Sequence, residues 1–273
     1  MKKLLLNLYL MTACIFAMNL FAEDNAEPVA TVGAPKLIVD NLVTTQAFYE
    51  DTFGMKELRR YDDNPDRYEE TIMGFDTGAR LALFAPNDNV EKPLQKSRSP
   101  VVLIYTPEFD QTLAKLKANK VEHRVLETGE GGPRIVIAYD PSNNAVEIYA
   151  RDGAWEVGGS KHIVDDRHKA EAFYKKVFHA KSGTVYQAEG VYDEVIMQLA
   201  SPTWLALFQP LAEEPKPKSM FPVTAFYTTD FDNVVKRIEE EGYGYRKLGD
   251  ANAQLRIIIA QDPAGNAIEI IRQ

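Results

Sequence analysis

An internal repeat constrains the fold of this chain more than any other feature of its sequence. A turn followed by a strand, DPSNNAVEIY at residues 140–149, recurs as DPAGNAIEII at residues 262–271. Each copy places one carboxylate, Glu147 or Glu269, at the same point of the strand. Since domains commonly contain about 100–150 residues, the 273 residues fit two tandem copies of one module.

The N-terminal segment differs in character from the rest of the chain. Lys2 and Lys3 precede an apolar run over residues 4–22, and acidic residues follow it. This pattern predicts a signal peptide at residues 1–22, so that the mature protein is exported to a bacterial periplasm or secreted and keeps no stable membrane span. A retained membrane anchor and a lipid attached to Cys14, in a segment that loosely resembles a lipobox, are the alternatives.

Composition excludes several classes of function. Cys14 is the only cysteine, so the folded part has no disulfide, cysteine nucleophile or thiolate metal site. Loss of Lys2 and Lys3 with the signal peptide changes the formal charge from -9 to -11. So acidic a protein is a poor partner for nucleic acid, whose backbone requires Lys and Arg patches. The sequence also contains no Gly-rich phosphate loop and no Ser-His-Asp pattern with supporting spacing.

Both modules show one order of elements. The helical stripe that contains Phe48 and Tyr49 recurs with Phe173 and Tyr174, and each module reads as two βαβββ halves, which indicates an α+β fold. We expect a flexible lead-in (residues 23–33), module one (34–150), a linker (151–158) and module two (159–273).

One half cannot bury both faces of its sheet, so two halves must associate. Helices then cover one face, and the other curves into a concave surface that suits a small-molecule ligand. The pairing can occur within one chain, which the short linker favours, or between chains, so both a monomer of two modules and a homodimer are open.

Several motifs together resemble the vicinal oxygen chelate superfamily, which includes glyoxalase I, bleomycin-resistance proteins and extradiol dioxygenases. They are the segment 39–42 (VDNL), Phe48-Tyr49, the segment 53–55 (FGM) and the Asp-Pro turn that leads to Glu147, with the counterparts Val164-Asp165-Asp166, Phe173-Tyr174 and the turn that leads to Glu269. The resemblance implies two tandem glyoxalase-like modules, each a pair of βαβββ units that form a curved, barrel-like mixed sheet.

In metal-dependent members, the resemblance implies, inward positions on the first, fourth, fifth and eighth strands hold the ion. Counted here, those positions are Ala34, Ala82, Val101 and Glu147 in module one, and Gly159, Ala206, Val223 and Glu269 in module two. A divalent catalytic ion needs roughly three protein ligands with donor atoms, so we expect no metal and no cofactor. The nearest histidine, His162, is an odd number of residues past Gly159 and should face the helices as a core residue.

The remaining candidate site residues are polar or aromatic, and all except Trp204 recur in both modules. Glu147 and Glu269 are either bases or ligand contacts, or structural partners of Arg134 and Arg256 on the preceding strand. Lys36 with Lys161, and Tyr105 with Tyr227, are rim residues or donors to a ligand; Glu70 and Glu194 are a further repeated pair; Phe84, Phe208 and Trp204 are candidate aromatic walls.

The sequence therefore favours an exported, metal-free member of the superfamily that binds a small organic molecule in a concave cavity. The alternative is an enzyme, a glyoxalase-like lyase or isomerase or a dioxygenase, with a non-standard site around Glu147 or Glu269. A structural or partner-binding protein whose cavities are filled by side chains is a third hypothesis.

Overall fold

The fold is described here from a computed structural model of the chain. It describes residues 26–62, 68–87, 101–126, 132–200, 202–211, 223–249, 254 and 256–273. The predicted signal peptide and Cys14 lie outside these residues. Among the residues described, no helix has both the length and the apolar character needed to cross a membrane.

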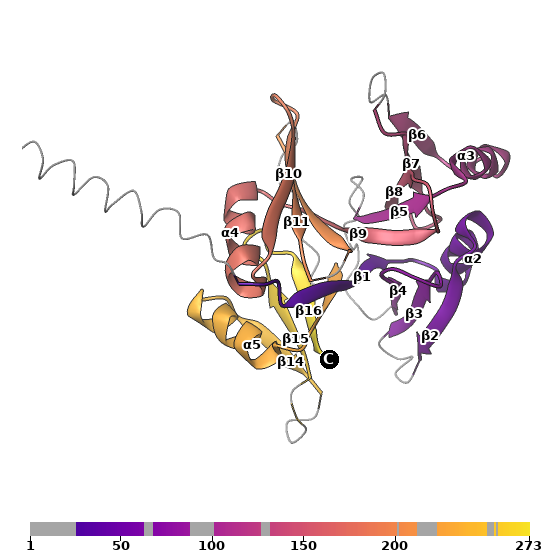
Figure 1. Cartoon of the computed structure of the whole chain (residues 1–273). Coiled ribbons are helices and arrows are strands. Elements are labelled where there is room, and N and C mark those ends of the chain that lie inside the picture. Colours follow the sequence, from indigo (N-terminus) through magenta and orange to yellow (C-terminus); the bar gives the residue numbers. More distant parts are fainter. Residues whose placement is uncertain are drawn as a thin grey trace, which may run out of the picture.

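Four βαβββ halves follow one another along the chain, as the sequence predicts (Figure 1). The first contains β1 (Ala30–Ile38), α2 (Leu42–Phe53), β2 (Lys56–Tyr61), β3 (Tyr68–Gly74) and β4 (Leu81–Pro86). The second contains β5 (Val102–Thr106), α3 (Phe109–Ala118), β6 (His123–Leu126), β7 (Ile135–Tyr139) and β8 (Ala145–Ala150). The third contains β9 (Glu156–Ile163), α4 (Arg167–Phe178), β10 (Lys181–Ala188), β11 (Tyr192–Gln198) and β12 (Trp204–Pro210). The fourth contains β13 (Thr224–Thr228), α5 (Phe231–Glu240), β14 (Tyr245–Leu248), β15 (Ile257–Gln261) and β16 (Ala267–Arg272).

The halves combine into two eight-stranded mixed sheets, and each sheet takes one half from each module. One has the order β14-β15-β16-β13-β1-β4-β3-β2 and the other β10-β11-β12-β9-β5-β8-β7-β6. The antiparallel pairs β1–β13 and β5–β9 join the halves, so the first half pairs with the fourth and the second with the third. The halves therefore pair within one chain.

Each module has its own hydrophobic core on the helix-covered faces of its two halves. In module one, Leu37 of β1 and Tyr49 of α2 pack in one cluster with Ile104, Leu116 and Ile148 of the second half. A second cluster of the same kind fills module two. Each module is thus a unit of hydrophobic packing. The two sheets connect the modules, because each sheet contains strands of both.

The repeated Asp-Pro turn ties the two halves of a module together. Asp140 Oδ1 accepts from the backbone N–H groups of Ser142 at 2.9 Å and Asn144 at 2.8 Å. The Asn144 side chain then donates to the carbonyl of Ile38 in β1, at 3.0 Å. The buried hydroxyl of Tyr49 donates to Asp140 at 3.4 Å, and the turn at Asp262 is built in the same way. The turn therefore has a structural role, to join the two halves of a module, and this role accounts for its recurrence.

Two glycines in the first strands of the modules let tyrosine rings approach the backbone. Each lies at a shift in strand register, Gly33 where β1 meets β13 and Gly158 where β9 meets β5. A Cβ atom at Gly33 would lie 2.0 Å from a ring carbon of Tyr227, and one at Gly158 would lie 2.2 Å from a ring carbon of Tyr105. These positions require the absence of a side chain, not a left-handed backbone.

Candidate functional site

A buried lysine lies between two carboxylates on the sheet formed by the second and third halves. Lys161 Nζ of β9 is 3.0 Å from Glu147 Oε2 of β8 and 2.8 Å from Glu194 Oε1 of β11. The three side chains are only 9%, 6% and 12% exposed, respectively. These residues, named here the Lys161 cluster, face away from the helices.

The other sheet contains an equivalent group, the Lys36 cluster. Lys36 Nζ of β1 is 2.7 Å from Glu70 Oε1 of β3 and 2.9 Å from Glu269 Oε2 of β16. Strand alternation places all three on the face away from the helices, because Lys36 is opposite Ala82, and Ala82 is opposite Ile72, two residues past Glu70. Both clusters therefore combine residues of module one with residues of module two.

Both lysines are held in the charged form. Burial alone lowers the pKa of a lysine, but for Lys36 and Lys161 the two neighbouring carboxylates outweigh burial and raise the pKa well above its ordinary value. In the Lys161 cluster, burial raises the pKa of Glu194, although the Lys161 ammonium opposes that shift. With both carboxylates ionised, each cluster has one negative charge in excess.

Aromatic side chains surround the Lys161 cluster. Trp204 Nε1 donates a 3.0 Å hydrogen bond to the hydroxyl of Tyr105. The rings of Tyr105 and Tyr149 are 6.1 Å apart, and the Tyr149 hydroxyl is 3.5 Å from Glu147 Oε1. Lys161 Nζ lies 5.2 Å from the centre of the Phe208 ring. All four rings are partly exposed, so they form an accessible wall beside buried charges.

The Lys36 cluster keeps the counterparts Tyr227 and Phe84 in its wall and differs at two other positions. Lys36 Nζ lies 5.9 Å from the Phe84 ring, which stacks on Tyr68 with centroids 5.0 Å apart. The repeat places Ile271 where the other cluster has Tyr149, and Arg80 where it has Trp204. Arg80 does not point its guanidinium at a tyrosine hydroxyl but donates to the carbonyl of Phe75 at 2.8 Å.

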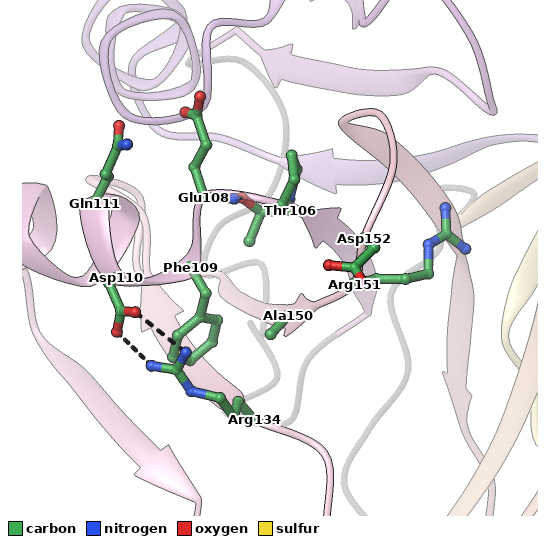
Figure 2. Close-up of a pocket in the computed structure, with 10 residues that line it drawn as sticks. Thr106, Glu108, Phe109, Asp110, Gln111, Arg134, Ala150, Arg151 and Asp152 are labelled. Atoms are coloured by element: carbon green, nitrogen blue, oxygen red, sulfur yellow. Dashed lines mark hydrogen bonds and ion pairs between the residues drawn. The ribbon is translucent and has the colours of Figure 1, made fainter.

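The predicted arginine partners of the two glutamates are wrong. Arg134 instead pairs with Asp110, lies 4.6 Å over the Phe109 ring, and lines a surface hollow of about 460 Å³ at the start of α3 (Figure 2). Arg256 is exposed. Each precedes its strand, and its long side chain reaches the surface. Lys36 and Lys161 instead reach the glutamates across one intervening strand, β13 or β5, and are buried, not rim residues.

The predicted fifth-strand positions are displaced by two residues. In the pairing of β13, Ala225 lies opposite both Ala34 and Glu269. In β5, Leu103 lies opposite both Gly159 and Glu147. The four positions of one site are therefore Ala34, Ala82, Ala225 and Glu269, and those of the other are Gly159, Ala206, Leu103 and Glu147. Val101 and Val223 lie one residue before their strands begin.

His162 lies on the helix side of β9, as expected for a core residue. It is buried, with Nδ1 2.7 Å from the Tyr174 hydroxyl and Nε2 2.8 Å from Thr224 Oγ1. Both ring nitrogens therefore have partners within the core, away from the Lys161 cluster.

Comparisons with known proteins agree with the fold described above. The model of the glyoxalase/bleomycin resistance protein/dioxygenase superfamily matches residues 30–148 and 161–270. The chain belongs to this superfamily. Glyoxalase I from Zea mays is 20% identical, with a TM-score of 0.75 over 89% of this chain and 92% of that one. A putative dioxygenase from Bacillus subtilis is 16% identical, with a TM-score of 0.67 over 90% of this chain and 86% of that one. Among curated proteins, none matches the sequence.

The side chains at the superfamily's metal positions do not fit a divalent ion. Ala34, Ala82 and Ala225 pack against one another as a small apolar cluster, and Glu269 is bound to Lys36. In the other site Gly159, Ala206 and Leu103 offer no donor atom, which leaves Glu147 alone, and it contacts Lys161. Within the described part of the chain, no three His, Cys, Asp or Glu side chains converge as an ion site. In each site the lysine ammonium contacts the glutamate that would otherwise bind a metal cation.

Proposed function

We propose that this superfamily member binds a small organic molecule on a sheet face between its modules and does so without a metal ion. The observation that carries the proposal is Lys161 Nζ between Glu147 and Glu194, 3.0 and 2.8 Å away. The fixed ammonium supplies positive charge beside the carboxylate that metal-dependent members use as a ligand. The chain thus keeps a charged site with no donor set for an ion.

The surroundings of the lysine support ligand binding. An ammonium group has three N–H donors, and in the Lys161 cluster two of them are directed at carboxylates. Partly exposed Tyr105, Tyr149 and Trp204 offer apolar area, hydroxyl groups and ring faces beside the charges. Few well-placed polar groups within an apolar wall are typical of small-molecule sites.

A binding screen with and without chelator tests the proposal. A library of small organic molecules is measured by thermal shift and then by calorimetry, on protein dialysed against EDTA and on untreated protein. We expect at least one ligand whose affinity is the same in both samples and falls in Trp204→Ala. Binding that disappears with EDTA and returns with a divalent ion would contradict the proposal, as would a library without any ligand.

An enzyme is the second candidate, a glyoxalase-like lyase or isomerase or a dioxygenase acting around Glu147 or Glu269. The raised pKa of Glu194 beside Glu147 favours it, because a carboxyl group with a raised pKa is a stronger proton acceptor than an ordinary glutamate. Turnover that Glu147→Gln or Glu269→Gln abolishes would support catalysis. A folded double variant that keeps full turnover would remove these glutamates from the chemistry.

We also propose export with cleavage after residue 22, on the strength of the apolar run at residues 4–22 behind two lysines. N-terminal sequencing of protein from cell fractions is the test. A mature chain that begins near Glu23 in the periplasm or medium supports it. An intact Met1, or a lipid lost in Cys14→Ser, contradicts it.

A further inference from the structure

The two clusters have the same charged residues but unequal surroundings. The Lys161 cluster has Tyr149 and Trp204 at positions where the Lys36 cluster has Ile271 and Arg80. Tyr149 and Trp204 both contact Tyr105, by ring packing and by a hydrogen bond of 3.0 Å, so three partly exposed aromatic residues form one wall. The difference suggests that one cluster serves a ligand and the other holds strands together.

The clusters differ in hydrogen bonding only at the last-strand glutamates, Glu269 and Glu147, because Glu70 Oε1 and Glu194 Oε1 both contact the ammonium as ion pairs. In the Lys36 cluster, Lys36 Nζ donates a proper hydrogen bond to Glu269, at 2.9 Å. In the Lys161 cluster, Glu147 Oε2 contacts the ammonium as an ion pair at 3.0 Å. An ionised carboxylate can accept several hydrogen bonds, so a ligand N–H group can donate to Glu147 and Glu194 while both keep their contacts with Lys161.

The sign of the charge selects the ligand. One ammonium and two ionised carboxylates leave a negative excess at the Lys161 cluster, and raised electron density on the faces of Tyr105, Tyr149, Trp204 and Phe208 also favours a cation. An anionic ligand would meet a lysine that is already neutralised. Arg151 shows that this wall accepts a cation, since its guanidinium carbon lies 3.6 Å from the centre of the Tyr105 ring.

We propose that the Lys161 cluster and its aromatic wall bind a small organic ammonium ion, one with at least one N–H group and an aromatic or apolar body. The N–H groups donate to Glu147 and Glu194, and the body packs on Tyr105, Tyr149 and Trp204. The Lys36 cluster has no such role. This inference rests on the proposed small-molecule function and specifies its ligand class and its location.

Four matched probes test the class by calorimetry on the full mature chain. Benzylammonium is cationic with N–H groups, benzyltrimethylammonium is cationic without them, benzyl alcohol is neutral and benzoate is anionic. We expect benzylammonium to bind at least about tenfold tighter than benzyl alcohol, a difference of roughly 1.4 kcal/mol, and benzyltrimethylammonium to lie between them. Benzoate should bind most weakly.

Exchange of the walls tests the location. Tyr149→Ile with Trp204→Arg gives the Lys161 cluster the residues of its counterpart without touching Lys161, Glu147 or Glu194. We expect this double variant to lose benzylammonium binding about tenfold or more, with near-ultraviolet circular dichroism showing an intact fold. Glu194→Gln should weaken the same probe, whereas the matched change Glu70→Gln in the Lys36 cluster leaves the Kd within about twofold.

The outcomes separate this inference from the proposed function. Benzoate or benzyl alcohol binding as tightly as benzylammonium overturns the ammonium class but leaves small-molecule binding in place. Equal loss in Glu70→Gln and Glu194→Gln overturns the assignment to one cluster. Failure of all four probes to bind overturns the inference, and the wider library then tests the proposed function alone.

Discussion

Glu147 and Lys161 form a 3.0 Å ion pair between the last strand of module one and the first strand of module two. The pair exists because β5 lies between β8 and β9 in one continuous sheet. Lys36 and Glu269 join the first and last strands of the chain in the same way. Neither cluster is therefore complete in a single module, and its residues report on the association of the modules as well as on ligand binding.

Replacement of one lysine should expose the cost of two facing carboxylates. Lys161→Met removes the ammonium but leaves Glu147 and Glu194 buried, so we expect a loss of about 3–5 kcal/mol in the free energy of unfolding, measured in urea at pH 7. The control is the triple variant with Glu147→Gln and Glu194→Gln, which carries no charge at this place. It should recover most of the loss, and a triple variant as unstable as Lys161→Met would contradict the charge explanation.

The same lysine variant should acquire an affinity for divalent ions. Without the ammonium, Glu147 and Glu194 offer carboxylate oxygens to a hard cation such as Mn²⁺, with a Kd on the order of 0.1–1 mM because two protein ligands make a weak site. We expect millimolar Mn²⁺ to raise the Tm of Lys161→Met and not that of the parent protein. Equal shifts in both proteins would argue that the ammonium does not take the place of a cation.

Glu194 should make stability depend on pH between about 4.3, the ordinary pKa of a glutamate, and its raised folded-state value. In this window the folded protein binds more protons than the unfolded chain, so stability contributed by this group rises as the pH falls. We expect the parent protein to gain stability relative to Glu194→Gln when urea unfolding is repeated at pH 5 instead of 7. A relative loss on acidification would show that the pKa of Glu194 is lowered.

Gly158 of β9 should be required for the position of Tyr105 in the aromatic wall. In Gly158→Ala, the added Cβ displaces the Tyr105 ring, which lies 2.2 Å from its position, and weakens the bond to Trp204. Overpacking of this kind costs typically about 1–3 kcal/mol. The emission of Trp204, measured with Trp155→Phe as background, should shift. Gly244→Ala, where no atom lies within 4 Å of the new Cβ, is the control and should change neither quantity.

Much of the fold could be predicted from the sequence because short-range patterns determine it. The Asp-Pro turns, the helix stripes and strand alternation located four halves and assigned His162 to the core. The sequence could not predict that halves of different modules pair in one sheet. Pairing within a module and pairing across modules bury the same residues, so the hydrophobic pattern does not distinguish them. The prediction that Arg134 pairs with Glu147 was wrong for the same reason. Arg134 is close to Glu147 in sequence, whereas Lys161 comes near Glu147 only through the β5–β9 pairing.

The sequence also held unused information on the site. Glu70 and Glu194 recur beside Tyr68 and Tyr192, yet only strand register shows that they face the lysines. Tyr149 shares a face with Glu147, but its contact with Tyr105 depends on strands brought together by the fold. Repeated polar residues on one strand face, read as possible partners of one another, are the pattern that would have found both clusters.

The metal content of natively purified protein tests most directly whether a lysine ammonium replaces the ion. Mature chain from its own host, prepared without chelator, is analysed for Ni, Zn, Fe and Mn, and ligand affinity is measured before and after EDTA. We predict less than about 0.1 ion per chain and unchanged affinity, since neither cluster offers the roughly three donor ligands that a tightly held ion needs. About one tightly bound ion per chain, removed by EDTA together with ligand binding, would contradict this central claim.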